Sequence, residues 1–127
     1  MIVNVPISLG ELIDKISILL IKEKNISDEK KLSKIHEELS LLNKTLNHRI
    51  NDNNIKNYLN KLVEINAKLW KIEDDIRGCE RNNKFDKIFI DLARSVYITN
   101  DKRSEIKNEI NKKFGSTIVE VKSYKKY

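Results

Sequence analysis

The sequence predicts a mainly α-helical protein, and three observations carry that prediction. Apolar residues recur at spacings of three and four along most of the 127 residues, which places them on one face of a helix. Only three glycines and one proline are present, so few positions interrupt a helix. Hydrophobic residues make up 39% of the chain, enough to fold despite its high charge. The length predicts one domain, residues 1–127.

The N-terminal part predicts a short strand and then a helix. Residues 2–7 alternate loosely and are β-branched, as in a strand. Ser8 and Glu11 form a Ser-x-x-Glu capping box, which predicts a helix from Leu9 to about Lys24. The second half of this helix is apolar almost all round, so several helices or a partner chain are expected to cover it. Its polar stripe, which includes Glu11, is interpreted as a solvated edge, with a ligand-facing stripe as the alternative.

Two longer helices are predicted in the middle of the chain. The second helix, capped by Ser27 or Asp28, repeats leucine and isoleucine in heptads up to about Arg49. A polar turn, residues 51–54, has the length that joins antiparallel helices. The third helix continues the three-and-four spacing from Tyr58 to Cys79. We therefore expect the second and third helices to form a long antiparallel hairpin.

The C-terminal third predicts two short helices and a strand. A fourth helix is expected over residues 84–98, and residues 99–101 supply possible caps for a fifth helix that stops at Gly115. Residues 117–124 alternate and are β-branched, so they predict a strand that pairs with residues 2–5. The expected fold is thus a helical hairpin packed with an N-terminal helix and two short C-terminal helices. A small two-stranded sheet from the termini completes it.

Several kinds of site have no signal in this sequence. A single cysteine, Cys79, excludes an intramolecular disulfide, and two histidines, His36 and His48, give no metal-ligand spacing. No phosphate-binding loop, dinucleotide-binding glycine pattern or Ser-His-Asp set is suggested. We therefore predict no catalytic residues, metal or cofactor, and leave open whether the protein is an enzyme.

The charge pattern and the ends of the chain bear on location and partners. Residues 102–127 carry eight Lys or Arg against three Glu, whereas residues 1–101 carry seventeen against sixteen acidic residues. This basic end offers an attraction for nucleic acid, but it lacks the interleaving of aromatic residues with arginines that is expected of a dedicated nucleic-acid reader, so nucleic acid is an unlikely partner. No export signal or membrane span is recognisable, and a cytoplasmic location is expected.

An arginine cluster is the candidate site. Four of the five arginines lie within residues 70–103, in a chain whose cations are otherwise nearly all lysine. Arginine binds carboxylate and phosphate through a rigid fork of donors that lysine lacks. If the third, fourth and fifth helices converge, the free N-terminus of the fifth helix adds to the attraction for an anion. The candidate anion-binding residues are Trp70, Arg77, Tyr97, Arg94, Arg103 and Lys107, with Glu73 and Asp74 as orienting carboxylates.

The alternative interpretation of this cluster is structural. Glu73, Asp74 and Glu80 are spaced to form interhelical ion pairs with the arginines, and such pairs would fix how the short helices dock. An anion site needs unpaired cations, and carboxylates are as numerous as arginines here. The spacing alone does not separate the two interpretations.

Four segments resemble a family of small uncharacterised bacterial and phage proteins, known as a domain of unknown function. They are GELIDKISIL at 10–19, LWKIEDDIR at 69–77, LARSVYITNDKR at 92–103 and IVEVKSY at 118–124. The resemblance implies a single domain over nearly the whole chain and no catalytic residues.

The stretch ELIDKISILLIK is also similar to the first helix of helical chorismate mutases. That similarity implies a pocket of arginines and lysines for a dicarboxylate. The chain departs from this family because Glu11 stands where an arginine is expected, and because the helix ends by Asn25.

These patterns support two hypotheses about function. The first is a non-enzymatic interaction or assembly module, a homodimer formed through the apolar first helix and the heptad seams. The second is a small anion-binding enzyme or sensor for a phosphorylated or dicarboxylate metabolite that uses the arginine cluster.

Overall fold

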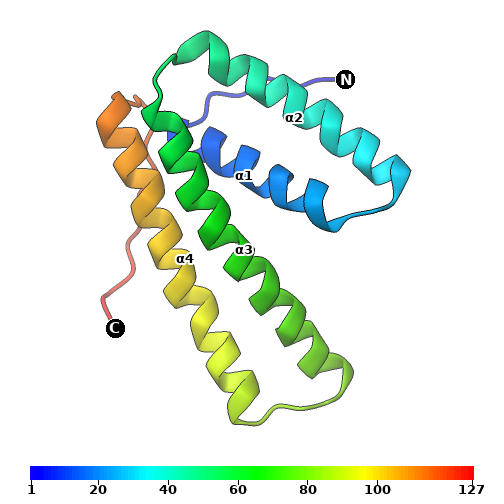
Figure 1. Ribbon diagram of the computed structural model, residues 1–127. Helices are drawn as coiled ribbons and strands as arrows, with labels where there is room; N and C mark the ends of the chain where they lie inside the picture. Colours follow the sequence, from blue (N-terminus) through cyan, green and yellow to red (C-terminus); the bar gives the residue numbers. More distant parts are fainter.

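The computed structural model describes residues 1–127 and contains four helices and no strand (Figure 1). The helices are α1 (Leu9–Asn25), α2 (Glu29–Arg49), α3 (Asn54–Arg81) and α4 (Lys87–Phe114). The mainly helical fold class predicted from the periodicity is confirmed. No helix has both the length and the apolar content that crossing a membrane requires.

Local capping chemistry explains where three of the helices begin. The Ser8 hydroxyl accepts a hydrogen bond from the Glu11 N–H at 3.1 Å, as the capping box predicts. The Asp28 carboxylate caps α2 by accepting from the Lys31 N–H at 2.9 Å. Asp86 caps α4 in the same way. At the other end of α4, Gly115 takes the left-handed conformation, with φ of 66°, that commonly ends a helix.

The four helices form two antiparallel hairpins that meet along α1. α1 packs on each of the other helices, α2 packs on α1 alone, and α3 pairs with α4 along its length (Figure 1). The fully buried apolar side chains Ile13, Ile16, Leu62 and Ile110 come from α1, α3 and α4. The apolar character of α1 on nearly all sides, predicted from its sequence, is explained by this central position.

The predicted hairpin of residues 29–49 with residues 54–81 is wrong in its pairing. α2 turns its heptad seam, with Ile35, Leu39 and Leu46 buried, onto α1, and α3 forms the long hairpin with α4. A heptad seam specifies an apolar face but not the helix that covers it. α1 has apolar surface on several sides and takes the place between α2 and α3.

The two short C-terminal helices are one continuous helix, so the predicted break at residues 99–101 is wrong. Val96, Thr99, Arg103, Ile106 and Ile110 lie at spacings of three and four, and all five are at least partly buried. This face continues past the polar triplet Thr99, Asn100 and Asp101, so α4 stays packed against α3 and α1 on both sides of these residues. Packing therefore outweighs the local preference of Thr, Asn and Asp for a cap.

The predicted two-stranded sheet does not form. The terminal segments start side by side, where the Leu9 N–H donates to the Ser116 hydroxyl at 3.1 Å. They then separate: the N-terminal segment passes behind α2 in the view of Figure 1, and the C-terminal segment runs down α4. Their alternating apolar residues stay exposed, as Val3 (71%) and Val121 (85%) illustrate.

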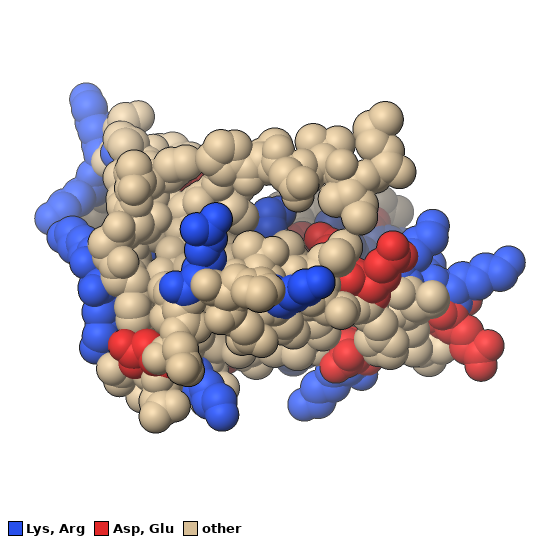
Figure 2. Space-filling view, turned by 90° about the horizontal axis from the view of Figure 1, so that it is seen from above, with Lys and Arg blue, Asp and Glu red and all other residues tan.

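The charged residues are distributed unevenly over the surface. Seen from above, Lys and Arg side chains gather at the left edge of the view, the end where α2 and α4 finish, and an uncharged strip runs along the upper edge (Figure 2). Residues 1–10 carry no charged side chain.

The far half of the α3–α4 hairpin projects beyond the rest of the molecule (Figure 1). We call residues 67–106 the distal arm. None of these residues is buried, whereas Asn66 and Lys107 on either side of the arm are. α1 has 17 residues and α3 has 28, so α1 is about 16 Å too short to cover the whole hairpin.

Candidate functional site

A buried lysine joins α1, α4 and the C-terminal segment. The Lys107 ammonium lies 2.6 Å from a Glu11 carboxylate oxygen, 3.3 Å from Glu120 and 3.8 Å from Asp14. Lys107 is 6% exposed and Asp14 is 3% exposed. The sequence predicted Lys107 as a candidate anion-binding residue, but three carboxylates of the chain already surround it, so it has no free charge for a ligand.

The ion cluster shifts the titration of two of its members. Burial alone would lower the pKa of Lys107, but the hydrogen bond to Glu11 and the charges of Asp14, Glu11 and Glu120 outweigh burial and raise this pKa. The hydrogen bond from Lys122, followed by the charge of Lys107, lowers the pKa of Glu120. Both ions are therefore charged at neutral pH, and the cluster acts as an electrostatic clamp on the C-terminal segment.

A second set of polar contacts connects this cluster to α3. The Asn66 side-chain amide donates to Asp14 Oδ1 at 2.8 Å and to the Ser17 hydroxyl at 2.7 Å. The Ser17 hydroxyl in turn donates to the Asp14 backbone carbonyl at 2.6 Å. Because both Asn66 N–H groups are used on α1, its side-chain oxygen faces α4. There it accepts a hydrogen bond from Arg103 Nη1 at 3.4 Å.

Arg103 is the least compensated cation in the structure's interior. Its Nη2 donates to Asn100 Oδ1 at 2.8 Å, and its buried Nε has no hydrogen-bond partner. No carboxylate lies within 4 Å of it. Leaving a buried charged donor unpaired costs folding free energy, so Arg103 keeps capacity to bind an anion.

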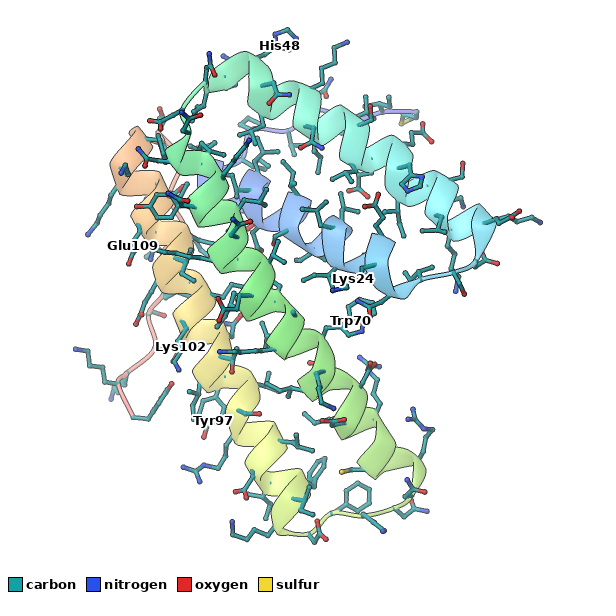
Figure 3. The ribbon with its side chains drawn as sticks, in the orientation of Figure 1. Lys24, His48, Trp70, Tyr97, Lys102 and Glu109 are labelled. Atoms are coloured by element: carbon teal, nitrogen blue, oxygen red, sulfur yellow. The ribbon has the colours of Figure 1, made fainter.

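A groove of about 320 Å³ opens between α1 and α3, with Arg103 at its wall. It contains five of the eight predicted site residues: Trp70, Glu73, Asp74, Arg77 and Arg103. Asn66, Ile18, Ile21 and Leu69 complete the lining. Trp70 lies between α3 and the end of α1 that carries Lys24 (Figure 3). This groove is the candidate site.

Two further predicted residues lie elsewhere. Tyr97 projects from the far side of α4, away from Trp70 (Figure 3), so the two rings do not edge one pocket. Arg94 is exposed and lines neither the groove nor the pocket beside Tyr97. The predicted N-terminus of a fifth helix, with its dipole, does not exist because α4 is continuous.

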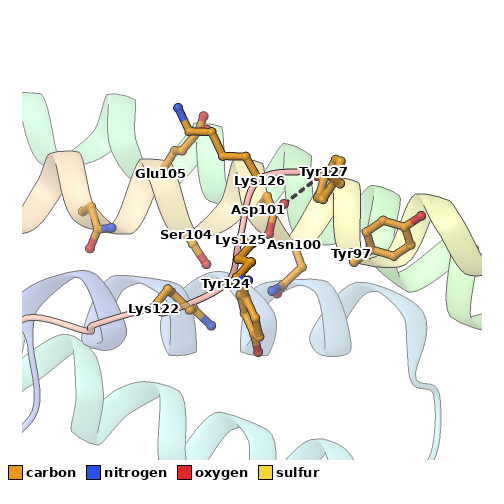
Figure 4. A pocket seen from close by; sticks show the side chains of 11 residues that line it. Tyr97, Asn100, Asp101, Ser104, Glu105, Lys122, Tyr124, Lys125, Lys126 and Tyr127 are labelled. Atoms are coloured by element: carbon orange, nitrogen blue, oxygen red, sulfur yellow. Dashed lines mark hydrogen bonds between the residues drawn. The ribbon is translucent and has the colours of Figure 1, made fainter.

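Tyr97 belongs instead to a hollow of about 710 Å³ between α4 and the C-terminal segment (Figure 4). The Tyr127 hydroxyl donates to Asp101 Oδ2 at 2.6 Å, and its ring meets the Tyr97 ring edge to face at 5.3 Å. The hydrogen bond to Asp101 raises the pKa of Tyr127 to about 12. These contacts fasten the last residue of the chain to α4.

The alternative of interhelical ion pairs is not realised in the form expected. Only Arg77, among the arginines, has a carboxylate within 4 Å, and its partner Glu73 lies at 3.4 Å on the same helix. Both side chains are largely exposed, where such pairs contribute little to stability. The arginines therefore do not dock α3 on α4 through carboxylates.

Sequence reasoning missed the polar residues that organise the site, namely Asp14, Ser17, Asn66, Asn100 and Glu120. A signal was present for two of them, because Asp14 and Ser17, together with Lys15, are the polar residues in the otherwise apolar stretch 12–21. A polar residue on an apolar helix is expected to find a buried partner. No group of three His, Cys, Asp or Glu side chains is placed to hold a metal ion.

Comparison with known proteins identifies a family. No curated protein and no solved structure is significantly similar to the chain. The sequence profile of the Family of unknown function (DUF6165) matches residues 3–127, which confirms the resemblance to an uncharacterised family noted from the four segments. The chain therefore belongs to the family of unknown function DUF6165.

Proposed function

We propose that this protein is a non-enzymatic assembly module that forms a homodimer through its distal arm. The observation that carries the proposal is that no residue from 67 to 106 is buried, although each helix of this arm carries an apolar seam. The seam residues are Leu69, Ile72, Ile76 and Cys79 on α3 and Phe89, Leu92 and Val96 on α4. Most helices in proteins are stabilised by packing of their apolar faces, not by intrinsic propensity. A two-helix hairpin alone supplies one layer, and a stable domain needs a second.

The surface chemistry of the arm supports association with another protein. Phe85 is 51% exposed, Ile88 65% and Ile90 53%, and all three lie at the end of the hairpin where α3 connects to α4. Phe85 and Phe89 stack edge to face at 5.2 Å. Large apolar side chains that gather at one exposed place are typical of interaction sites.

The net charge of the arm supports a second copy of the chain as the occupant. Residues 67–106 contain nine basic and eight acidic side chains, so two arms approach without strong repulsion. Two hairpins that pack face to face around a two-fold axis form a four-helix bundle and cover both seams. No other segment of the chain extends over the tip (Figure 1).

Light scattering coupled to size-exclusion chromatography over a wide protein concentration range tests the proposal. We expect a dimer whose dissociation constant rises roughly tenfold or more in Ile88→Glu, because a carboxylate is costly to bury in an interface. Ser33→Glu, an exposed change on α2 with the same charge difference, is the control and should leave the dimer intact. A species that stays monomeric at high concentration contradicts the proposal, and equal effects of both variants contradict the placement of the interface.

We also infer a second candidate function, recognition of a small anion in the α1–α3 groove. One observation favours it: Arg103 is partly buried, lines the groove and has no carboxylate within 4 Å. Binding alone would make the protein a sensor, and a chemical step on the bound anion would make it an enzyme. Six of the nine groove residues belong to the distal arm, but none of them lies in residues 82–90 at its tip. Anion recognition and dimer formation are therefore compatible where the second copy packs on the tip.

A further inference from the structure

The α1–α3 groove has one unpaired charge of each sign. Two arginines, Arg77 and Arg103, and two carboxylates, Glu73 and Asp74, line it. Glu73 and Arg77 pair with each other at 3.4 Å. This pairing leaves Arg103 as the free cation and Asp74 as the free anion. Asp74 has no basic group within 4 Å and no side-chain hydrogen bond.

The Arg103 end suits a carboxylate. A guanidinium has five N–H donors, and only two neutral oxygens, of Asn66 and Asn100, accept from it. Charge-assisted hydrogen bonds from arginine to a carboxylate are stronger than those to neutral amides. Asn66 keeps its oxygen toward Arg103, because its amide nitrogen is engaged by Asp14 and Ser17. The arginine is therefore oriented before any ligand arrives.

The Asp74 end suits an amine. Asn66, which accepts a hydrogen bond from Arg103, marks the Arg103 end of the groove on α3. Asn66 and Asp74 are eight residues apart, so the two ends of the groove are about 12 Å apart along the helix. Allowing about 3 Å for the contact at each end leaves roughly 6 Å or somewhat more between the two ionic groups of a ligand. Trp70, halfway between these residues, and Ile21 on the facing helix supply apolar surface along the gap.

We propose that this groove binds a zwitterion of the ω-amino carboxylate class. The carboxylate contacts Arg103, the protonated amine contacts Asp74, and the methylene chain lies along Trp70 and Ile21. A simple dianion would meet the negative charge of Asp74 at one end of the groove. The inference rests on the second candidate function, anion recognition at Arg103, and adds the requirement for an amine.

Fluorescence of Trp70 tests the proposal directly, because this is the only tryptophan in the chain. The ligands are ω-aminohexanoate, hexanoate, which lacks the amine, and adipate, which replaces the amine with a second carboxylate. We expect ω-aminohexanoate to bind about fivefold more tightly than hexanoate, the gain of one partly exposed ion pair, and adipate to bind most weakly.

Variants separate the two ends of the groove. Asp74→Asn, at an exposed position, should reduce the affinity for ω-aminohexanoate to that for hexanoate and leave hexanoate binding unchanged. Arg103→Gln should abolish binding of both. Glu64→Gln, an exposed acidic position of α3 outside the groove, is the control and should change neither.

The outcomes distinguish the proposed zwitterion from anion recognition in general. No fluorescence response to any of the three ligands overturns the zwitterion and, with it, carboxylate recognition at Arg103. Binding of hexanoate or adipate as tight as that of ω-aminohexanoate, lost in Arg103→Gln, overturns only the requirement for an amine. An unchanged preference in Asp74→Asn overturns the assignment of Asp74.

Discussion

Lys107 is the residue on which the packing of α1, α4 and the C-terminal segment depends most. Lys107→Met keeps the apolar stem but leaves Glu11, Asp14 and Glu120 close together without their cation. Removing one partner of a buried ion pair costs about 3–5 kcal/mol. Since Glu11 and Glu120 are partly exposed, we expect a loss of about 3 kcal/mol in the free energy of unfolding. Urea unfolding followed by circular dichroism measures it.

Lys112→Met is the matched control for this variant. Lys112 lies on the same helix but is exposed, with no carboxylate within 4 Å, so its loss should change stability by less than about 0.5 kcal/mol. If both variants lose the same stability, the effect belongs to net charge and the ion cluster is not the cause.

The spacing of residues along α3 predicted the groove better than it predicted the positions of the candidate residues on α4. Trp70, Glu73, Asp74 and Arg77 recur at spacings of three and four, so they share a face of α3 whatever that helix contacts. The predicted positions of Tyr97 and Arg94 are wrong because their orientation depends on how α4 is rotated against α3. That rotation is set by packing and cannot be read from residue types.

The crossing of α1 over α4 depends on Gly10. The Gly10 N–H donates to Asn111 Oδ1 at 2.7 Å, and a Cβ added at Gly10 would lie 2.5 Å from the Lys107 backbone oxygen. Alanine gains about 1 kcal/mol in helix propensity, but overpacking against backbone costs about 1–3 kcal/mol. We expect Gly10→Ala to lower the free energy of unfolding by about 1 kcal/mol, measured by urea unfolding.

Gly78→Ala gives the opposite sign and serves as the control. Gly78 is also helical, and the nearest atom to an added Cβ is the flexible end of Arg81 at 3.7 Å. Only the propensity gain remains there, so a rise of about 0.5–1 kcal/mol is expected. A Gly10→Ala variant as stable as Gly78→Ala would show that the helices can separate without cost.

At the level of elements, the sequence predicts where the chain is helical but divides α4 into two short helices. The capping box at Ser8 and the heptads of α2 are local signals, and the helices they predict are present. The polar triplet at residues 99–101 is also a cap signal, but here it lies inside α4 because Arg103 and Ile106 continue the packed face. A local capping preference does not end a helix where the buried face of that helix continues past it and packs on other helices.

The pairing of helices is a property of the whole molecule, and sequence patterns leave it open. Both α2 and α3 carry seams that fit an antiparallel partner, yet α2 packs on α1 and α3 packs on α4. The choice depends on α1, whose residues 12–21 offer apolar surface to several neighbours at once. The same arrangement leaves the tip of the distal arm, where α3 connects to α4, beyond the reach of α1 (Figure 1).

Amide hydrogen exchange should divide the molecule into two parts. Local openings are cheapest where few apolar contacts are broken, so amides of residues 72–98 should exchange roughly 30-fold or more faster than those near Leu62 and Ile110 in dilute protein. Raising the protein concentration should slow exchange in the arm alone if a second copy covers it, because binding stabilises the closed form. Equal protection of both parts in dilute protein would mean that the α3–α4 hairpin is stable without a partner, and the reason for proposing a dimer would be lost.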